Sequence, residues 1–230
     1  MSGVVLLLGF VDRHAATPSD VPTHRRVPSS GDLDAILIDA AAVEGAPELE
    51  GMELAMAQVS ILSAYAAKDD VLPVALGAAF SGDEALHAHV DAAAPLLHAQ
   101  RAAIAGRSEW IVAIDRQRPD EASQRSEGPG YLRRRQAEIG ARRDLERARG
   151  AFISSVIQAV GTGEVRLGRP QARPRESLAV VAALVKRAGA DGVTKRLEEL
   201  AAEGERLGLA LRLIGPCAPF SFMAAEGRDG

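Results

Sequence analysis

Residues 128–160, GPGYLRRRQAEIGARRDLERARGAFISSVIQAV, decide how this chain is organised. Their apolar spacing predicts one helix, about 50 Å long at about 1.5 Å per residue. In its first half one apolar residue recurs every two turns among arginines, and from Phe152 to Val160 the apolar stripe widens into a core-facing surface. We therefore expect the second half to anchor a domain from which the first half projects. Gly140 and Gly150 each cost about 1 kcal/mol relative to alanine, so any bend is expected near Gly150.

The residues before this helix predict a first α+β unit. Pro73 cannot donate to a strand ladder and is expected at a sheet edge or a bulge. Ser81 and Glu84 form a capping-box pattern that predicts a helix start. Apolar runs and helical periodicity indicate strands at 4–11, 33–38, 71–77 and 110–114, helices at 52–67 and 81–104, and a proline-rich loop at 13–32.

A second set of elements follows the helix. Strands are predicted at 164–167, 178–185 and 209–214, and a helix that Asp191 caps and Gly208 ends lies before the last of them. This order suits a small sheet covered on one face by helices. We predict an α+β fold of two domains with ferredoxin-like elements joined by the long helix, with domains at 1–116 and 117–230.

Composition narrows the class of protein. The balance of 47% hydrophobic and 25% charged residues is that of a globular chain, and the net charge of −4 gives no general attraction to nucleic acid or an anionic membrane. No signal peptide is recognisable, and the longest uncharged helical run is too short and too polar to span a bilayer. One cysteine excludes an intrachain disulfide. We expect a cytoplasmic protein.

The sequence contains no pattern that supports catalysis or metal binding. No pair of histidines has metal-ligand spacing, and Cys217 lies in a proline-rich turn with no base beside it in sequence, which favours an inert thiol. Gly161-Thr162-Gly163 follows a helix instead of opening one, the wrong order for a phosphate loop. The strands at 164–167 and 178–185 carry no aromatic residue to stack on RNA bases. We therefore predict no enzyme activity, cofactor or metal, and no nucleic-acid or membrane partner.

The arginines of the long helix allow two interpretations. They could bind an acidic or phosphate-bearing partner, or they could form a solvated face. The chain contains only three lysines, Lys68, Lys186 and Lys195, so arginine is its usual cation and carries little information by itself. We favour the solvated face.

Three segments, in order, resemble the gas vesicle protein F/L family (GvpF/GvpL). The first, VLPVALGAAF at 71–80, is similar to the family's LPV-R-FG-T-x-F; the second, GYL at 130–132, opens the arginine-rich helix; the third, GPCAPFSF at 215–222, is similar to G-P-W-P-P-Y-S-F. Ala75 replaces the family's arginine, Leu76 its aromatic residue, and Cys217-Ala218 its Trp-Pro. The motif positions, as structural or partner-binding residues, are Leu72, Pro73, Val74, Gly77, Phe80, Tyr131, Leu132, Gly215, Pro216, Pro219, Phe220, Ser221 and Phe222.

The resemblance implies a non-enzymatic gas vesicle assembly or accessory protein, in the cytoplasm and at the vesicle, whose partners are the hydrophobic shell protein and other minor vesicle proteins. We expect the partner surface along the apolar seam of the projecting half-helix or in a groove between the domains. The alternative is a regulatory module that binds a small molecule between paired α+β domains. A thermal shift with one metabolite would favour the module, and co-purification with the shell protein would favour the assembly factor.

Overall fold

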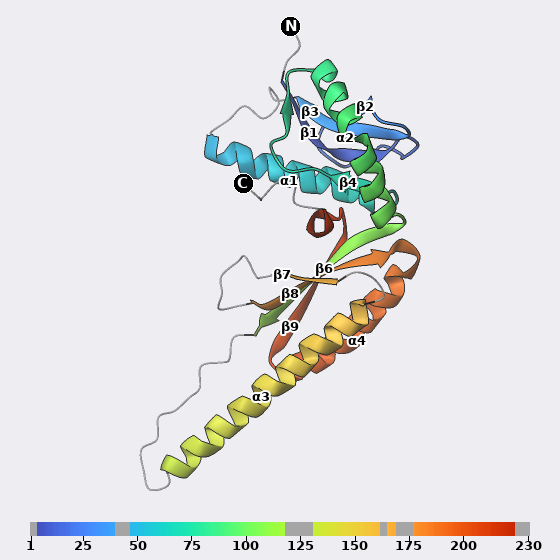
Figure 1. Ribbon diagram of the computed structural model, residues 1–230. Coiled ribbons are helices and arrows are strands. Elements are labelled where there is room, and N and C mark those ends of the chain that lie inside the picture. Colours follow the sequence, from blue (N-terminus) through green and yellow to red (C-terminus); the bar gives the residue numbers. More distant parts are fainter. Residues whose placement is uncertain (1–3, 40–46, 118–130, 162–164, 169–176, 224–230) are drawn as a thin grey trace. The chain divides into compact units, whose positions relative to one another are not determined.

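A computed structural model describes residues 4–39, 47–117, 131–161, 165–168 and 177–223. The elements are, in chain order, β1 (Val5–Asp12), β2 (Arg25–Pro28), β3 (Leu33–Asp39), α1 (Pro47–Ala66), β4 (Val71–Pro73), β5 (Ala79–Phe80), α2 (Asp83–Ile104), β6 (Arg107–Arg116), α3 (Tyr131–Val160), β7 (Val165–Gly168), β8 (Ser177–Lys186), the short 3-10 helix η2 (Arg187–Gly189), α4 (Ala190–Arg206), β9 (Leu209–Cys217) and the 3-10 helix η3 (Phe220–Phe222) (Figure 1).

The chain forms two compact units, and each is assembled from separate stretches of sequence. Unit 1 comprises Met1–Trp110, Leu184–Arg187 and Ile214–Gly230, and unit 2 comprises Ile111–Ala183 and Ala188–Leu213. Each sheet is antiparallel, so the fold is mixed helix and sheet and the α+β prediction is confirmed. Residues 214–223 therefore belong to the same unit as β1.

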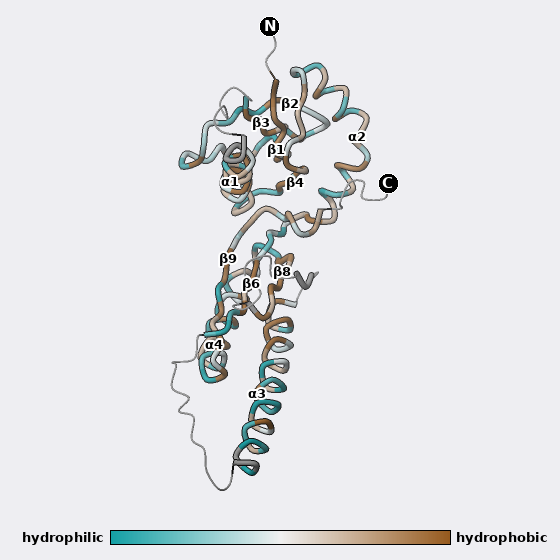
Figure 2. The backbone as a smooth tube through the Cα atoms, turned by 90° about the vertical axis from the view of Figure 1, so that its left-hand side faces the viewer, coloured by the Kyte–Doolittle hydropathy of each residue, from teal (hydrophilic) through white to brown (hydrophobic). Residues whose placement is uncertain are grey.

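Unit 1 is built on a sheet in the order β2-β3-β1-β4, with β5 also paired to β1. In β1, Phe10 lies opposite Ala35 of β3 and Leu72 of β4. α1 and α2 lie on opposite sides of these strands (Figure 2). Both faces of the sheet are therefore covered, which explains why β1 reads as an unbroken apolar run. β4 is at the end of this strand order, so Pro73 is at a sheet edge, as predicted.

The interval 13–32, predicted as a loop, contains the strand β2, so that prediction was wrong. β2 has the sequence RRVP and pairs with β3, with Arg26 opposite Ile36. The polar residues of β2 conceal the strand pattern in the sequence. They have structural partners: the Arg26 guanidinium donates to the backbone oxygens of Ala15, Asp12 and Arg13 and to the Asp34 carboxylate. Edge strands often carry charge, which removes the apolar alternation that identifies inner strands.

Two helix-cap predictions were also wrong. α2 begins at Asp83, so Gly82, with φ 139°, occupies the N-cap position that was predicted for Ser81. No side chain caps this helix. Asp83 and Glu84 instead lie in the first turn, where they complement the helix dipole. α4 begins at Ala190 directly after η2, so Asp191 lies in the first turn and Gly189 occupies the cap.

Unit 2 combines the sheet order β7-β8-β6-β9 with the helices α3 and α4. α3 runs unbroken through Gly140 and Gly150, so the predicted helix is confirmed over Tyr131–Val160, with no break at Gly150. Residues 128–130 of that prediction lie outside the described residues. Its second half is buried at Phe152, Val156 and Val160, as predicted. α4 lies beside this half in Figures 1 and 2, and Gly204 of α4 sits against the Phe152 ring.

Candidate partner-binding site

α1 connects the parts of unit 1 that carry the first and third family-like motifs. Its inner residues Leu54, Ile61, Leu62 and Tyr65 belong to a buried cluster with strand residues and Ala218, and Phe220 packs against that cluster. Helical periodicity predicted this inner face, and all four residues are buried. The N-terminal sheet and the C-terminal motif therefore share one hydrophobic core.

Gln58 fixes α1 to the sheet by polar contacts. Its side chain is buried, and its Nε2 donates to the backbone oxygens of Leu8 and Val74, each at 2.9 Å. The Val74 N–H also donates to the Leu8 oxygen, at 3.2 Å. The buried Gln58 amide holds the helix in one position, because moving it would break both bonds and leave the amide itself without its acceptors.

The first motif forms the edge of this sheet and the turn after it. Leu72 is buried, and Pro73 pairs with Gly9 of β1. A side chain at Gly9 would place Cβ 2.6 Å from the Leu72 oxygen, so only glycine permits this close approach. Gly77 has φ 90°, a left-handed turn position, and the Phe80 ring lies 5.1 Å from that of His89.

The third motif ends β9 and forms η3. Gly215 has φ 149°, and a Cβ there would lie 2.9 Å from the Trp110 ring; its bond to Pro216 is cis. Beside it, the buried Glu109 carboxylate accepts the Ser221 N–H at 2.8 Å and the Ser221 hydroxyl at 2.6 Å. Pro219 occupies the N-cap of η3, and Phe222 is buried. The charged Glu109 carboxylate of β6 thus holds η3 in place.

The second motif lies apart from the other two in the fold. Tyr131 and Leu132 form the first turn of α3 in unit 2, and their side chains are outside the described residues. The structure therefore brings the first and third motifs together and leaves the second in another unit.

The outer face of α1 is apolar as well. Met52, Met56 and Val59 are 64%, 67% and 47% exposed, and their spacing of i, i+4 and i+7 places them on one side of the helix. We call these three residues the α1 stripe. Thioether side chains adapt to partner surfaces of varied shape, which makes such a stripe suited to binding an apolar partner.

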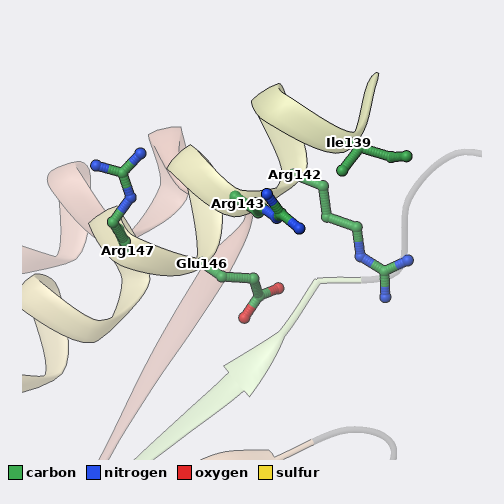
Figure 3. Close-up of a pocket in the computed structure, with 5 residues that line it drawn as sticks. All are labelled: Ile139, Arg142, Arg143, Glu146 and Arg147. Atoms are coloured by element: carbon green, nitrogen blue, oxygen red, sulfur yellow. The ribbon is translucent and has the colours of Figure 1, made fainter. Parts of the chain in front are cut away.

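The first half of α3 has the opposite surface chemistry. An open hollow of about 670 Å³ lies on this helix (Figure 3). The described residues that line it are Ile139, Arg142, Arg143, Glu146 and Arg147. Arg147 forms an ion pair with Asp144, and Glu146 forms one with Arg149 at 3.1 Å. Most of this half is exposed, as predicted for the projecting part of the helix.

The titratable groups of unit 1 that show shifted pKa values have structural roles. Two hydrogen bonds from Arg25 of β2, at 2.8 and 3.0 Å, lower the pKa of Asp83 at the start of α2. A hydrogen bond from Arg101 likewise lowers the pKa of Asp32. Burial raises the pKa of the Cys217 thiol, which favours its unreactive form. These pairs join elements to one another and do not converge on a cavity.

Among the described residues, no group of three His, Cys, Asp or Glu side chains could hold a metal ion. Two histidines instead make contacts within unit 1: His24 Nε2 is 2.9 Å from the Tyr65 hydroxyl, and His87 Nε2 is 2.9 Å from the Pro28 oxygen. No helix in the described ranges is long and apolar enough to cross a membrane.

Sequence reasoning missed Gln58, Glu109 and the α1 stripe. Gln58 lies 50 and 16 residues from Leu8 and Val74, and Glu109 lies 112 residues from Ser221, so no local pattern signals their burial. The stripe did leave a signal, since apolar residues of α1 occur on both its inner and its outer side, without the contrast between faces that a surface helix normally shows.

Comparison with known proteins gives one sequence family and one fold. The family model "Gas vesicle synthesis protein GvpL/GvpF" matches residues 12–224. The fold is similar to the crystal structure of the gas vesicle protein GvpF from Anabaena sp. PCC7120, with 14% identity, a TM-score of 0.65 and 98% of each chain covered. GvpF from Microcystis aeruginosa matches with 13% identity and a TM-score of 0.64, over 96% of this chain and 99% of that one. No curated protein sequence matches this chain.

Proposed function

Because this chain belongs to the GvpL/GvpF family of gas vesicle synthesis proteins, we propose that it binds the hydrophobic shell protein during vesicle assembly. Family membership supports an accessory role in gas vesicles and interaction with other gas vesicle proteins. The proposal includes other minor vesicle proteins as partners, a non-enzymatic role, and action in the cytoplasm and at the vesicle.

The observation that supports shell-protein binding is the α1 stripe. A subunit that polymerises through apolar, strand-forming surface is prone to aggregate before it assembles. A partner that covers such surface needs an exposed apolar face of its own, held on a rigid element. Met52, Met56 and Val59 supply that face, and Gln58 and the inner core residues hold the helix that carries it.

Co-purification with the shell protein tests this proposal. We expect the wild-type chain to retain the shell protein and Met52→Glu/Met56→Glu to lose it, because each glutamate puts a charge where apolar surface would be buried. Ala92→Glu/Leu96→Glu is the matched control: it adds the same charge at the same i, i+4 spacing on exposed positions of α2. This control should bind like wild type.

Two results would count against the proposal at different levels. If the wild-type chain fails to retain the shell protein where a known assembly partner succeeds, shell binding is wrong. If wild type, the α1 double variant and the α2 control all bind equally, shell binding stands and the α1 stripe is the wrong surface.

A further inference from the structure

We propose that the hollow on the first half of α3 binds an acidic amphipathic helix of a partner protein. We give the name arginine face to the described residues that line it, Ile139, Arg142, Arg143, Glu146 and Arg147. This surface lies in unit 2 and has chemistry opposite to that of the α1 stripe, so it would bind a different partner segment.

The arginine face is a continuous strip along one helix. Ile139, Arg142, Arg143 and Glu146 follow the spacing i, i+3, i+4 and i+7, which places them on neighbouring turns of one side. Figure 3 shows these side chains along successive turns of α3, with Ile139 and Arg142 at one end, Arg147 at the other, and Arg143 and Glu146 between them. The strip spans about 12 Å of helix at about 1.5 Å per residue, the length of two turns of a docked helix.

Charge pairing leaves two of these arginines available. Arg147 is paired with Asp144, and Glu146 is shared between Arg149 and Arg116. Within the described residues Arg142 and Arg143 form no ion pair, and both are exposed. Beside them Ile139 is 43% exposed, an apolar side chain in an otherwise charged stretch. Two adjacent unpaired guanidinium groups next to an exposed isoleucine fit a ligand with carboxylates and a nearby apolar group.

These charges favour an acidic helix over the other classes of partner. An apolar surface would have to remove water from Arg142 and Arg143 without returning a hydrogen bond, which is costly. A nucleic acid presents an unbroken row of phosphates, some of which would lie against Glu138, Asp144 and Glu146, because these acids alternate with the arginines. A helix with glutamates four residues apart can place them on the two guanidinium groups while a leucine covers Ile139.

The test uses the full chain and a fluorescent synthetic peptide as the probe. The peptide carries about three heptads of leucine and glutamate on one helical face. We expect binding that weakens as salt is raised, because the attraction is between exposed charges. Arg142→Glu/Arg143→Glu should weaken binding about tenfold or more, since two attractions become repulsions.

Arg133→Glu/Lys195→Glu serves as the matched control. It changes the net charge by the same amount, but Arg133 lies on the opposite side of α3 from Arg142, nine residues away, and Lys195 is on α4. This variant should keep peptide affinity within about twofold of wild type, since distant surface charges are largely screened. Circular dichroism checks that both variants stay folded.

The proposal is overturned by any of four results. These are no peptide binding at low salt, equal weakening by the control variant, equal affinity for a scrambled peptide of the same composition, and equal or tighter binding of a single-stranded oligonucleotide of matched charge. The last result would assign the arginine face to a nucleic acid.

Discussion

α1 and α3 expose surfaces of opposite chemistry, and they are held in place in different ways. α1 is fastened along its inner side by the buried core and by Gln58, and its outer side is apolar. Among the described side chains of α3, the buried ones lie in its second half, and its first half presents charge to solvent. In α1 the attached part is the opposite side of the helix, and in α3 it is the other half. The exposed surface of each helix is the part that these attachments leave uncovered.

The largest effect is expected at the anchor of α3. Phe152→Ala should lower the free energy of unfolding by about 3–5 kcal/mol, because Phe152 is fully buried against α4. Ile139→Ala, on the exposed half of the same helix, should change it by less than about 0.5 kcal/mol. Urea denaturation of both variants measures the contrast. Similar losses at the two positions would mean that the first half of α3 is also anchored.

The polar attachment of α1 comes next in size. Gln58→Leu keeps the side-chain volume but removes the donor to the Leu8 and Val74 oxygens. We expect a loss of about 1–3 kcal/mol, because the Val74 oxygen loses its Gln58 donor, while the Leu8 oxygen keeps the Val74 N–H. Ser60→Ala, at an exposed position of α1, should be neutral within about 0.5 kcal/mol. A neutral Gln58→Leu would assign the position of α1 to apolar packing alone.

A smaller effect is expected where the C-terminal motif is fastened beside α1. Ser221→Ala removes the hydroxyl that donates to the Glu109 carboxylate and keeps the backbone donor. The expected loss is about 1–2 kcal/mol, since the acceptor is charged and buried. Hydrogen exchange of the Phe222 amide, which donates to Pro219, should accelerate as η3 loosens. Ser154→Ala, at an exposed site on α3, should leave both measurements unchanged.

The smallest change concerns reactivity and not stability. Because burial raises the pKa of the Cys217 thiol, its thiolate fraction at a given pH is lower in the folded chain than in the unfolded one. Alkylation by iodoacetamide near pH 8 should therefore be slower than after unfolding in urea, and its rate should keep rising at more alkaline pH. Equal rates in folded and unfolded chains would show that the motif opens freely from α1.

Local sequence patterns were sufficient to predict most of the helices and strands around α1 and α3. The apolar run of β1, the inner positions of α1 and the core half of α3 were all predictable, because each is a periodic signal within one segment. β2 was missed since its arginines are used for ion pairs and backbone contacts with distant residues. The N-terminal end of α1 was predicted five residues late, at Met52 instead of Pro47.

Long-range pairing was not predictable from the sequence. β6 lies between β8 and β9 in one sheet, although those strands follow it by more than sixty residues. The buried Glu109 is indistinguishable in sequence from a solvated glutamate, because its partner Ser221 lies 112 residues away. The family-like motifs were recognisable in the sequence, but the proximity of the first and third motifs beside α1 became apparent only in the fold.

The C-terminal motif has a consequence for how this chain is made. Ala218 belongs to the same buried cluster as Leu8 and Ile61, so the core of unit 1 is completed by residues that are translated after those of unit 2. Until they emerge, the sheet and α1 have an uncovered apolar patch that Ala218 and Phe220 later fill. The core of unit 1 is therefore closed only after unit 2 has been synthesised, and until then the apolar surface of the nascent N-terminal segment is exposed to aggregation.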